Sequence, residues 1–228
     1  MSTPTPRIAL FGNPVMLGSS VLLYGAALVA YVLLLMPMNG RMGPLDLLFI
    51  AAAALWPVAI NLLAGDRARD SGLPLGNLRS GIAPILIFTL INIVMITAVG
   101  LLSGGFHWQS VKTLLDKAAI YLAWGPAQQY LLNSFGLRRL RQAGLAVGPA
   151  AIVSAAIFAM IHAPNWPLVA VTFLGGVGWC MLFVRWPNIL LLGLSQGVLA
   201  MLIYHAWPDA WLQRLTIGRM YLHRIGSP

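Results

Sequence analysis

Long stretches without a charged residue constrain the fold of this chain most strongly. Charged residues make up 8% of its 228 residues and hydrophobic residues 59%, whereas a soluble domain averages about a quarter charged. Several uncharged stretches exceed the ~20 apolar residues that a helix needs to cross a bilayer. The sequence therefore excludes a soluble protein and predicts an all-α, polytopic transmembrane helical bundle, built as a single domain over residues 1–228.

Hydropathy divides the chain into seven apolar segments. They run over residues 15–36, 44–64, 81–102, 118–135, 149–163, 165–184 and 187–206. Pro149 and Pro164 bound the fifth segment and keep it short, so we expect it to lie among other helices or to meet the membrane at one surface only. Residues 106–117 precede the fourth segment and combine lysines with a tryptophan, which predicts a separate helix on the membrane surface.

Basic residues are divided unevenly between the two ends of these segments. Eight lie at one end, namely Arg7, Arg67, Arg69, Arg79, Arg138, Arg139, Arg141 and Arg185, and three at the other, namely Arg41, Lys112 and Lys117. Because basic loops stay in the cytoplasm, this predicts a cytoplasmic N-terminus, in the inner membrane of a bacterium. Residues 207–228 form a basic tail, and seven crossings would place it outside the cytoplasm, against the positive-inside rule. We therefore expect an eighth crossing or a tail that folds back, and favour the eighth crossing.

Acidic residues are few and peripheral. The chain has no glutamate, and its five aspartates lie at or beyond the ends of apolar segments, at Asp46, Asp66, Asp70, Asp116 and Asp209. Intramembrane cation sites and proton relays usually need carboxylates, which argues against an ion-coupled carrier. The basic excess is typical of attachment to an anionic leaflet rather than to nucleic acid. A single cysteine, Cys180, excludes a cysteine metal cluster, and we expect neither a metal nor a cofactor.

Polar side chains interrupt the fourth and fifth segments. Gln128 and Gln129 are adjacent in the fourth segment, and Asn133 follows Gln129 by four residues, so these two share a helix face. His162 ends the fifth segment, four residues after Phe158. Such residues inside apolar helices either join helices by hydrogen bonds or line a functional site.

The seventh segment carries the third polar group. Ser195 and Gln196 lie there between Gly193 and Gly197, a small-xxx-small spacing that lets two helix backbones approach closely. A similar stripe of alanines runs along the fifth segment. We therefore expect the fifth and seventh segments to be closely packed central helices, each presenting a polar group.

The three clusters, in this order and spacing, resemble the CAAX-protease and bacteriocin-processing (Abi) family of intramembrane proteins. Members of that family carry E-E-x-x-x-R on one helix, F-x-x-x-H on a later helix and H-x-x-x-N on a third. The resemblance covers about residues 118–206 and includes the glycine-rich run at 173–178 and the turn at 185–188. It implies an intramembrane-protease fold. In the enzymes, it implies a water activated by a glutamate and the histidines, supported by arginine and asparagine.

This chain departs from the family motifs at most positions. The corresponding residues are Gln128 and Gln129 for the two glutamates, Asn133 for the arginine, Phe158 and His162 for the middle motif, and Gln196 and Ala200 for the third motif. A register shifted by one residue places Ser195 and Leu199 in the third motif instead. Only the middle motif is intact in either register.

These substitutions predict that the ancestral protease chemistry is lost. A general base must take up a proton near neutral pH, which a primary amide does not do. The resemblance then implies a degenerate centre in which Gln129, Asn133, His162 and Gln196 bind a membrane partner: a protein subunit, a hydrophobic peptide or a lipid. The protein would act as a scaffold, assembly or immunity factor. Two alternatives stay open: the amides only join helices, or the chain is an endopeptidase with residual or altered chemistry centred on His162.

Overall fold

A computed structural model describes residues 13–36, 43–73, 78–107 and 110–226 of the chain. All regular elements in these residues are helical. They are α1 (Pro14–Ala30), η2 (Tyr31–Leu35), α3 (Pro44–Leu63), η3 (Ala68–Ser71), α4 (Leu78–Leu102), α5 (Val111–Gln129), η5 (Tyr130–Leu137), α6 (Arg138–Gln142), α7 (Val147–Met160), α8 (Trp166–Arg185), α9 (Ile189–Ala206), α10 (Asp209–Leu212), η6 (Gln213–Leu215) and α11 (Gly218–Gly226). The predicted all-α bundle is thus confirmed.

Polar side chains fix where the apolar helices begin. Asn13, Asn165 and Asn188 each accept a hydrogen bond from a backbone N–H in the first turn of α1, α8 and α9. Ser110 does the same for α5. Each cap satisfies a backbone donor that would otherwise lack a partner at the helix start.

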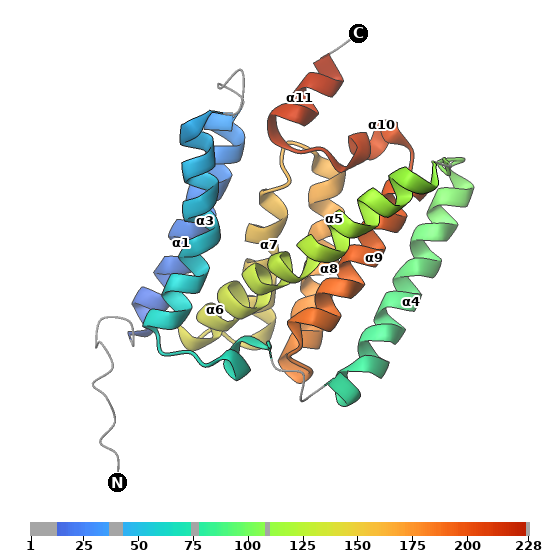
Figure 1. Cartoon of the computed structure of the whole chain (residues 1–228). Helices are drawn as coiled ribbons and strands as arrows, with labels where there is room; N and C mark the ends of the chain where they lie inside the picture. The colour runs from blue at the N-terminus through green and yellow to red at the C-terminus, as the bar shows by residue number, and fades with distance from the viewer. Residues whose placement is uncertain (1–12, 37–42, 74–77, 108–109, 227–228) are drawn as a thin grey trace.

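The helices form a bundle with a separate hairpin on one side (Figure 1). Helix α5 crosses the front of the bundle diagonally and packs on α9, which also packs on α4. Helices α7 and α8 pair behind them, and the hairpin of α1 and α3 meets this body through α6, α7 and η5. The fifth and seventh segments are closely packed, as expected: α7 packs on α8, and α9 packs on α5 and α4.

Glycines bring α5 and α9 into backbone contact. A Cβ on Gly125 would collide with the backbone of Gly193, and a Cβ on Gly197 would lie 2.8 Å from the carbonyl oxygen of Tyr121. The small-xxx-small pair predicted from the sequence therefore serves the α5–α9 contact. This contact sets the height at which polar residues on the two helices meet.

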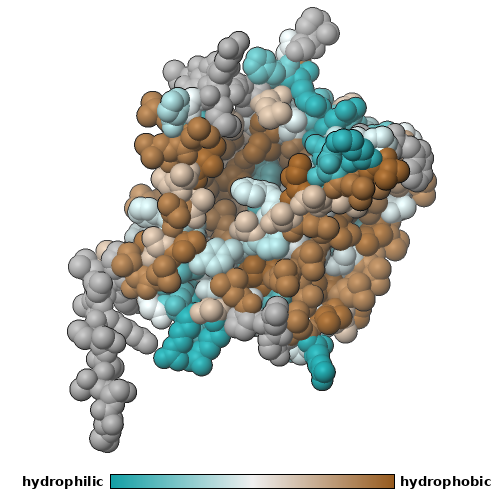
Figure 2. Space-filling model, in the orientation of Figure 1, coloured by the Kyte–Doolittle hydropathy of each residue, from teal (hydrophilic) through white to brown (hydrophobic). Residues whose placement is uncertain are grey.

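Five helices are long and apolar enough to cross a membrane: Pro14–Leu35, Pro44–Leu63, Leu78–Leu102, Trp166–Arg185 and Ile189–Ala206. Hydrophobic side chains cover the hairpin and the opposite side of the bundle, whereas hydrophilic ones gather towards its two ends (Figure 2). Helix α7 has 14 residues and rises about 21 Å, less than the ~30 Å hydrocarbon core. The short fifth segment is therefore confirmed.

Two expectations about the membrane surfaces need correction. Lys112 and Lys117 do not lie on a separate surface helix, because α5 begins at Val111 and continues through both lysines to Gln129. Trp108, the tryptophan of that prediction, lies outside the described residues, as do Arg7 and Arg41.

The tail does not make an eighth crossing in its described part. Helices α10 and α11 have 4 and 9 residues, too few to span a bilayer, and they lie at the end of the bundle where α9 finishes (Figure 1). The tail folds onto that end: the Asn165 Nδ2 atom donates to the carbonyl oxygens of Leu212 and Thr216, and the Gly218 N–H donates to that of Ala163. The folded-back alternative is the one observed.

Candidate functional site

Four amide side chains form a row between α5 and α9. The Asn133 Nδ2 atom donates to Gln129 Oε1 at 2.6 Å, and Gln129 Nε2 donates to Gln196 Oε1 at 2.7 Å. Gln196 Nε2 then donates to Gln128 Oε1 at 2.6 Å. We call these residues the amide row. It joins the first and third family motifs, whose positions are 67 residues apart in the chain.

The two central amides of the row have both ends engaged. Gln129 and Gln196 each accept one hydrogen bond and donate another within the row, and both are buried, as is Asn133. No described protein group hydrogen-bonds the buried Oδ1 atom of Asn133. The two central amides therefore have hydrogen-bond partners within the row, whereas the Oδ1 atom of Asn133 at one end has none among the described groups.

A π-helical segment carries Asn133. Helix α5 contains Pro126 and changes at Tyr130 into η5, a π-helix that extends to Leu137. Proline lacks the N–H of a regular helix, and π segments recur at functional sites. The wider turns of η5 place Asn133, four residues after Gln129, within hydrogen-bond reach of that side chain.

Ser195 points to a different neighbourhood from Gln196. Its Oγ atom receives hydrogen bonds from Thr89 Oγ1 at 2.7 Å and from Trp179 Nε1 at 3.2 Å, so it faces α4 and α8. Gln196 faces α5 instead. The arrangement places Gln196, and not Ser195, beside the first motif; Ala200, one turn later on α9, brings no polar group.

His162 stands apart from the amide row. It follows the end of α7, and its Nδ1 atom lies 3.1 Å from the carbonyl oxygen of Phe158, whose ring it contacts edge-on with centroids 5.3 Å apart. No hydrogen bond joins His162 to any of the four amides, all of which lie in described residues. The structure thus unites two of the three motifs and leaves the histidine aside.

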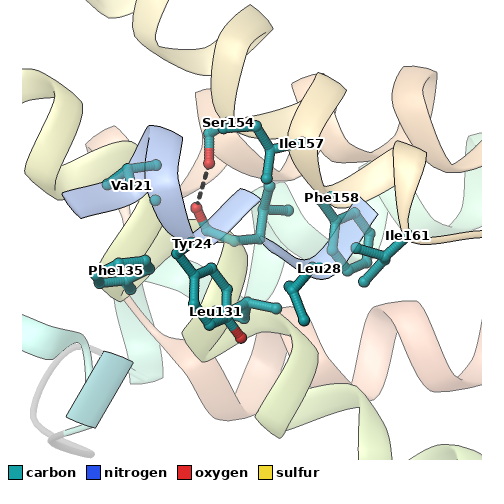
Figure 3. A pocket seen from close by; sticks show the side chains of 11 residues that line it. Val21, Tyr24, Leu28, Leu131, Phe135, Ser154, Ile157, Phe158 and Ile161 are labelled. Carbon is teal, nitrogen blue, oxygen red and sulfur yellow. Dashed lines mark hydrogen bonds between the residues drawn. The ribbon is translucent and has the colours of Figure 1, made fainter. Parts of the chain in front are cut away.

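Phe158 closes the space between α1, η5 and α7. Its ring lies with Tyr24, Leu131 and Ile161 around a cavity of about 10 Å³ (Figure 3), which is room for one water at most. The Ser154 Oγ atom donates to the carbonyl oxygen of Leu132 at 2.7 Å and so joins α7 to η5. The interior beside the middle motif is packed, with no chamber for a peptide.

An apolar groove lies on the hairpin, beside this packed region. It has a volume of about 280 Å³ and is lined by side chains of α1 and α3, namely Leu23, Tyr24, Ala27, Leu28, Phe49, Ala52, Ala53 and Trp56. The Tyr24 hydroxyl donates to the carbonyl oxygen of Ala53 at 2.9 Å and bridges the two helices. Both helices are candidate membrane spans, and the groove residues lie in the middle part of each.

Sequence reasoning missed a buried charge cluster at the end of the hairpin. Arg139 is fully buried, although the arginines at 138–141 were expected to act only on topology. Its guanidinium pairs with Asp66, as does that of Arg138, and its Nη2 atom donates to Asn61 Oδ1 at 2.7 Å. Asn61 in turn donates to the Tyr130 hydroxyl at 2.9 Å. The cluster fastens α3 to η5 and α6.

The described residues contain no group of three or more His, Cys, Asp or Glu side chains placed to hold a metal ion. Cys180 is a buried free cysteine. The polar groups described inside the bundle include the four amides, the His162 imidazole and the hydroxyls of Thr89, Ser154 and Ser195.

Comparison with known proteins gives a family for part of this arrangement. Residues 110–207 match the family described as type II CAAX prenyl endopeptidase Rce1-like. No curated protein and no solved structure matches the chain. The matched segment begins just before α5 and ends just after α9, so it holds the whole amide row and His162. This match over residues 110–207 agrees with the resemblance to the CAAX-protease family that the order of the motifs predicted.

Proposed function

We propose that this protein is a catalytically degenerate Rce1-like membrane protein that binds a hydrophobic segment of a membrane partner. The amide row is the single observation that carries this proposal. Gln129 stands where the family has a glutamate. Its carbonyl oxygen accepts a hydrogen bond from Asn133, and its amino group donates one to Gln196. A primary amide does not take up a proton near neutral pH, so Gln129 cannot act as the general base that a glutamate provides at this position.

His162 does not supply the missing base in this arrangement. A general base must lie within hydrogen-bond reach of the proton that it removes. The Nδ1 atom of His162 donates to the Phe158 carbonyl oxygen, so the lone pair lies on Nε2, and within the described residues no hydrogen bond joins this ring to the amide row where the family has its glutamates. The cavity beside Phe158 holds at most one water. These features support binding over residual endopeptidase chemistry.

The groove on the hairpin is the place where we expect the partner to bind. Its walls are apolar apart from the Tyr24 hydroxyl, which is already engaged with Ala53. An apolar pocket with few free polar groups suits a hydrophobic chain, and small residues such as Ala52 allow a helix to approach closely. A hydrophobic helix or peptide of a partner protein fits these walls.

The distribution of charge suggests the orientation. Arginines at 67–79, 138–141 and 185 share the end of the bundle from which α1 starts, whereas Lys112, Lys117 and the tail lie at the other end. The positive-inside rule places the first end, and the N-terminus, in the cytoplasm. We propose a bacterial inner-membrane protein in this orientation.

Two alanines of α3 allow a matched test of partner binding. Ala52 lines the groove and Ala54 does not, yet both are exposed. Native mass spectrometry of the chain released gently from its own membrane should show a bound protein or peptide, lost in Ala52→Leu and kept in Ala54→Leu. A chain that carries no partner, or that loses it equally in both variants, would contradict the proposal.

The competing enzyme hypothesis has its own readout. If His162 and Gln129 perform residual chemistry, the variant His162→Ala with Gln129→Ala should abolish a processed product while the partner stays bound. We expect no difference in processed peptides between that variant and the wild type at equal protein level. A reproducible product difference would establish an endopeptidase.

A further inference from the structure

Two histidines far apart in the chain meet beside the end of α9. His107 follows α4 and His205 lies in the last turn of α9, with their ring centroids 6.0 Å apart and their planes inclined by 46°. The His107 N–H donates to the His205 carbonyl oxygen at 3.1 Å. This backbone bond holds the two residues side by side, so that both rings can reach a common point.

Both imidazoles carry a buried nitrogen without a partner. No described protein group hydrogen-bonds the Nε2 atom of either His107 or His205, and both atoms are buried. In native structures, buried polar atoms nearly always have a partner, so two such atoms in neighbouring rings require an explanation. A ligand shared by the two nitrogens supplies one.

The tautomer of His107 suits a metal ligand. Its Nδ1 atom lies 2.9 Å from the carbonyl oxygen of Gly105, and a carbonyl can only accept, so Nδ1 carries the proton. The lone pair then resides on Nε2. Metal-binding histidines almost always donate their other ring N–H to a carbonyl or carboxylate in this way, which fixes the ring orientation.

The spacing fits one ion between two rings. A metal–imidazole bond of about 2 Å, extended by the radius of each ring, allows two ring centres up to about 6 Å apart to share a single ion in nearly linear coordination. Structural zinc is almost always bound by four ligands, and the described residues contain no third His, Cys, Asp or Glu for this position. Cu(I), by contrast, accepts two ligands in a line.

The charges around the pair favour a monovalent ion. The Lys117 ammonium lies 5.0 Å from the ring centroid of Tyr204, which itself contacts both histidines at centroid distances of 6.3 and 5.1 Å. Two described carboxylates on this side are already paired, Asp209 with Arg214 at 2.6 Å and Asp116 with Lys112 at 2.7 Å. A neutral pair of imidazoles beside a cation tolerates one positive charge better than two.

We propose that His107 and His205 form a two-coordinate Cu(I) site at the end of the bundle where the tail lies. The site lies outside the amide row and does not depend on the proposed function of that row. It binds the ion through the two Nε2 atoms and involves no redox step. Because Lys117 opposes a cation there, this residue limits the affinity.

Anaerobic titration of the full chain in detergent with Cu(I) alone, against a competing chromophoric chelator, tests the proposal. We expect one Cu(I) per chain and an X-ray absorption edge typical of two nitrogen ligands. His107→Ala and His205→Ala should each weaken binding at least about 100-fold, since loss of even an outer-shell partner costs 10–100-fold. His223→Ala, on exposed α11, is the matched control and should bind as the wild type does.

A second variant keeps both ligands and predicts a gain of affinity, which misfolding would not produce. Lys117→Met removes the opposing charge and should strengthen Cu(I) binding about tenfold, the effect of about 1.4 kcal/mol at one site. Absence of stoichiometric binding, binding that survives loss of both histidines, or Zn²⁺ binding as tight as Cu(I) would each overturn the assignment. A loss of binding in His223→Ala alone would place the ion on the tail and overturn it too.

Discussion

Gly125 on α5 faces Gly193 on α9 so closely that a β-carbon on either residue would collide with the backbone of the other helix. One turn further along each helix, Gln129 and Gln196 share a hydrogen bond of 2.7 Å. The glycine contact therefore sets the distance that the polar contact requires. Stability and the geometry of the candidate site depend on the same pair of backbones.

Gly125→Ala should destabilise the protein and separate the two central amides. Overpacking a close contact costs about 1–3 kcal/mol, and here the obstacle is backbone, which cannot rotate away. Thermal unfolding in detergent measures the loss. Gly148→Ala is the matched control, because a β-carbon there meets open space, and we expect it to leave the midpoint unchanged or raise it slightly. Equal shifts in both variants would contradict the backbone contact.

The central hydrogen bond of the amide row should appear as a coupling energy. Replacing Gln129 or Gln196 by leucine leaves a buried partner unsatisfied, which costs about 1–3 kcal/mol. The double variant removes both partners, so its loss should be smaller than the sum of the single losses by about 0.6–1.7 kcal/mol, as for other hydrogen bonds within membranes. A double-mutant cycle on unfolding free energies checks this, and strictly additive losses would mean that the bond contributes nothing.

Arg139→Met should be among the most destabilising single substitutions in the chain. Arg139 is fully buried and pairs with Asp66, and removing one partner of a buried pair costs about 3–5 kcal/mol. Arg138 still pairs with Asp66 in this variant, so we expect a loss near the lower end of that range. Asp116→Asn, which breaks an exposed pair with Lys112, should cost about 0–1 kcal/mol. Unfolding in denaturant measures the loss of unfolding free energy in each variant. Similar losses would show that the buried pair contributes no more to stability than the exposed one.

Asp70 should make a small, pH-dependent contribution to stability. The Arg67 backbone N–H donates to its carboxylate at 2.9 Å and holds the carboxyl pKa below its ordinary value of 3.8. Because the folded-state pKa is lowered, this stabilisation is present above pH 3.8 and is lost as the pH falls through the folded-state pKa. The difference in thermal unfolding midpoint between the wild type and Asp70→Asn should thus become smaller from pH 7 to pH 3. A difference that stays constant over this range would show that titration of Asp70 does not contribute to stability.

The sequence predicted those parts of the fold that depend on local pattern. Apolar run length predicted the membrane helices, and the spacing of Gly193 and Gly197 predicted a close helix contact. The partners of that contact could not be predicted, because a small-residue stripe specifies close approach but not which helix approaches. For the same reason the sequence did not show that the polar groups of α5 and α9 meet each other while His162, after α7, stays apart.

Long-range contacts account for what the sequence could not predict about the polar residues. In the sequence, Arg139 belongs to a run of basic residues that is typical of a cytoplasmic loop. Its partner Asp66 is 73 residues away, and only the fold brings the two together. His107 and His205 belong to no motif spacing, since one lies in the connection after α4 and the other in the last turn of α9. The continuity of α5 through Lys112 was also hidden, because its first turns are amphipathic and resemble a surface helix.

The amide row has a property that its residue types alone confer. The oxygen and nitrogen of a primary amide have nearly the same size and position, so the same heavy-atom distances admit a second state in which every donor and acceptor in the row is exchanged. In one state Asn133 is left with an unpartnered carbonyl, and in the other with an unpartnered amino group. Ionised glutamates can only accept hydrogen bonds, so they would not allow this exchange of donors and acceptors. Amides in place of carboxylates thus give the centre of this bundle two hydrogen-bonding patterns that fit one and the same arrangement of the helices.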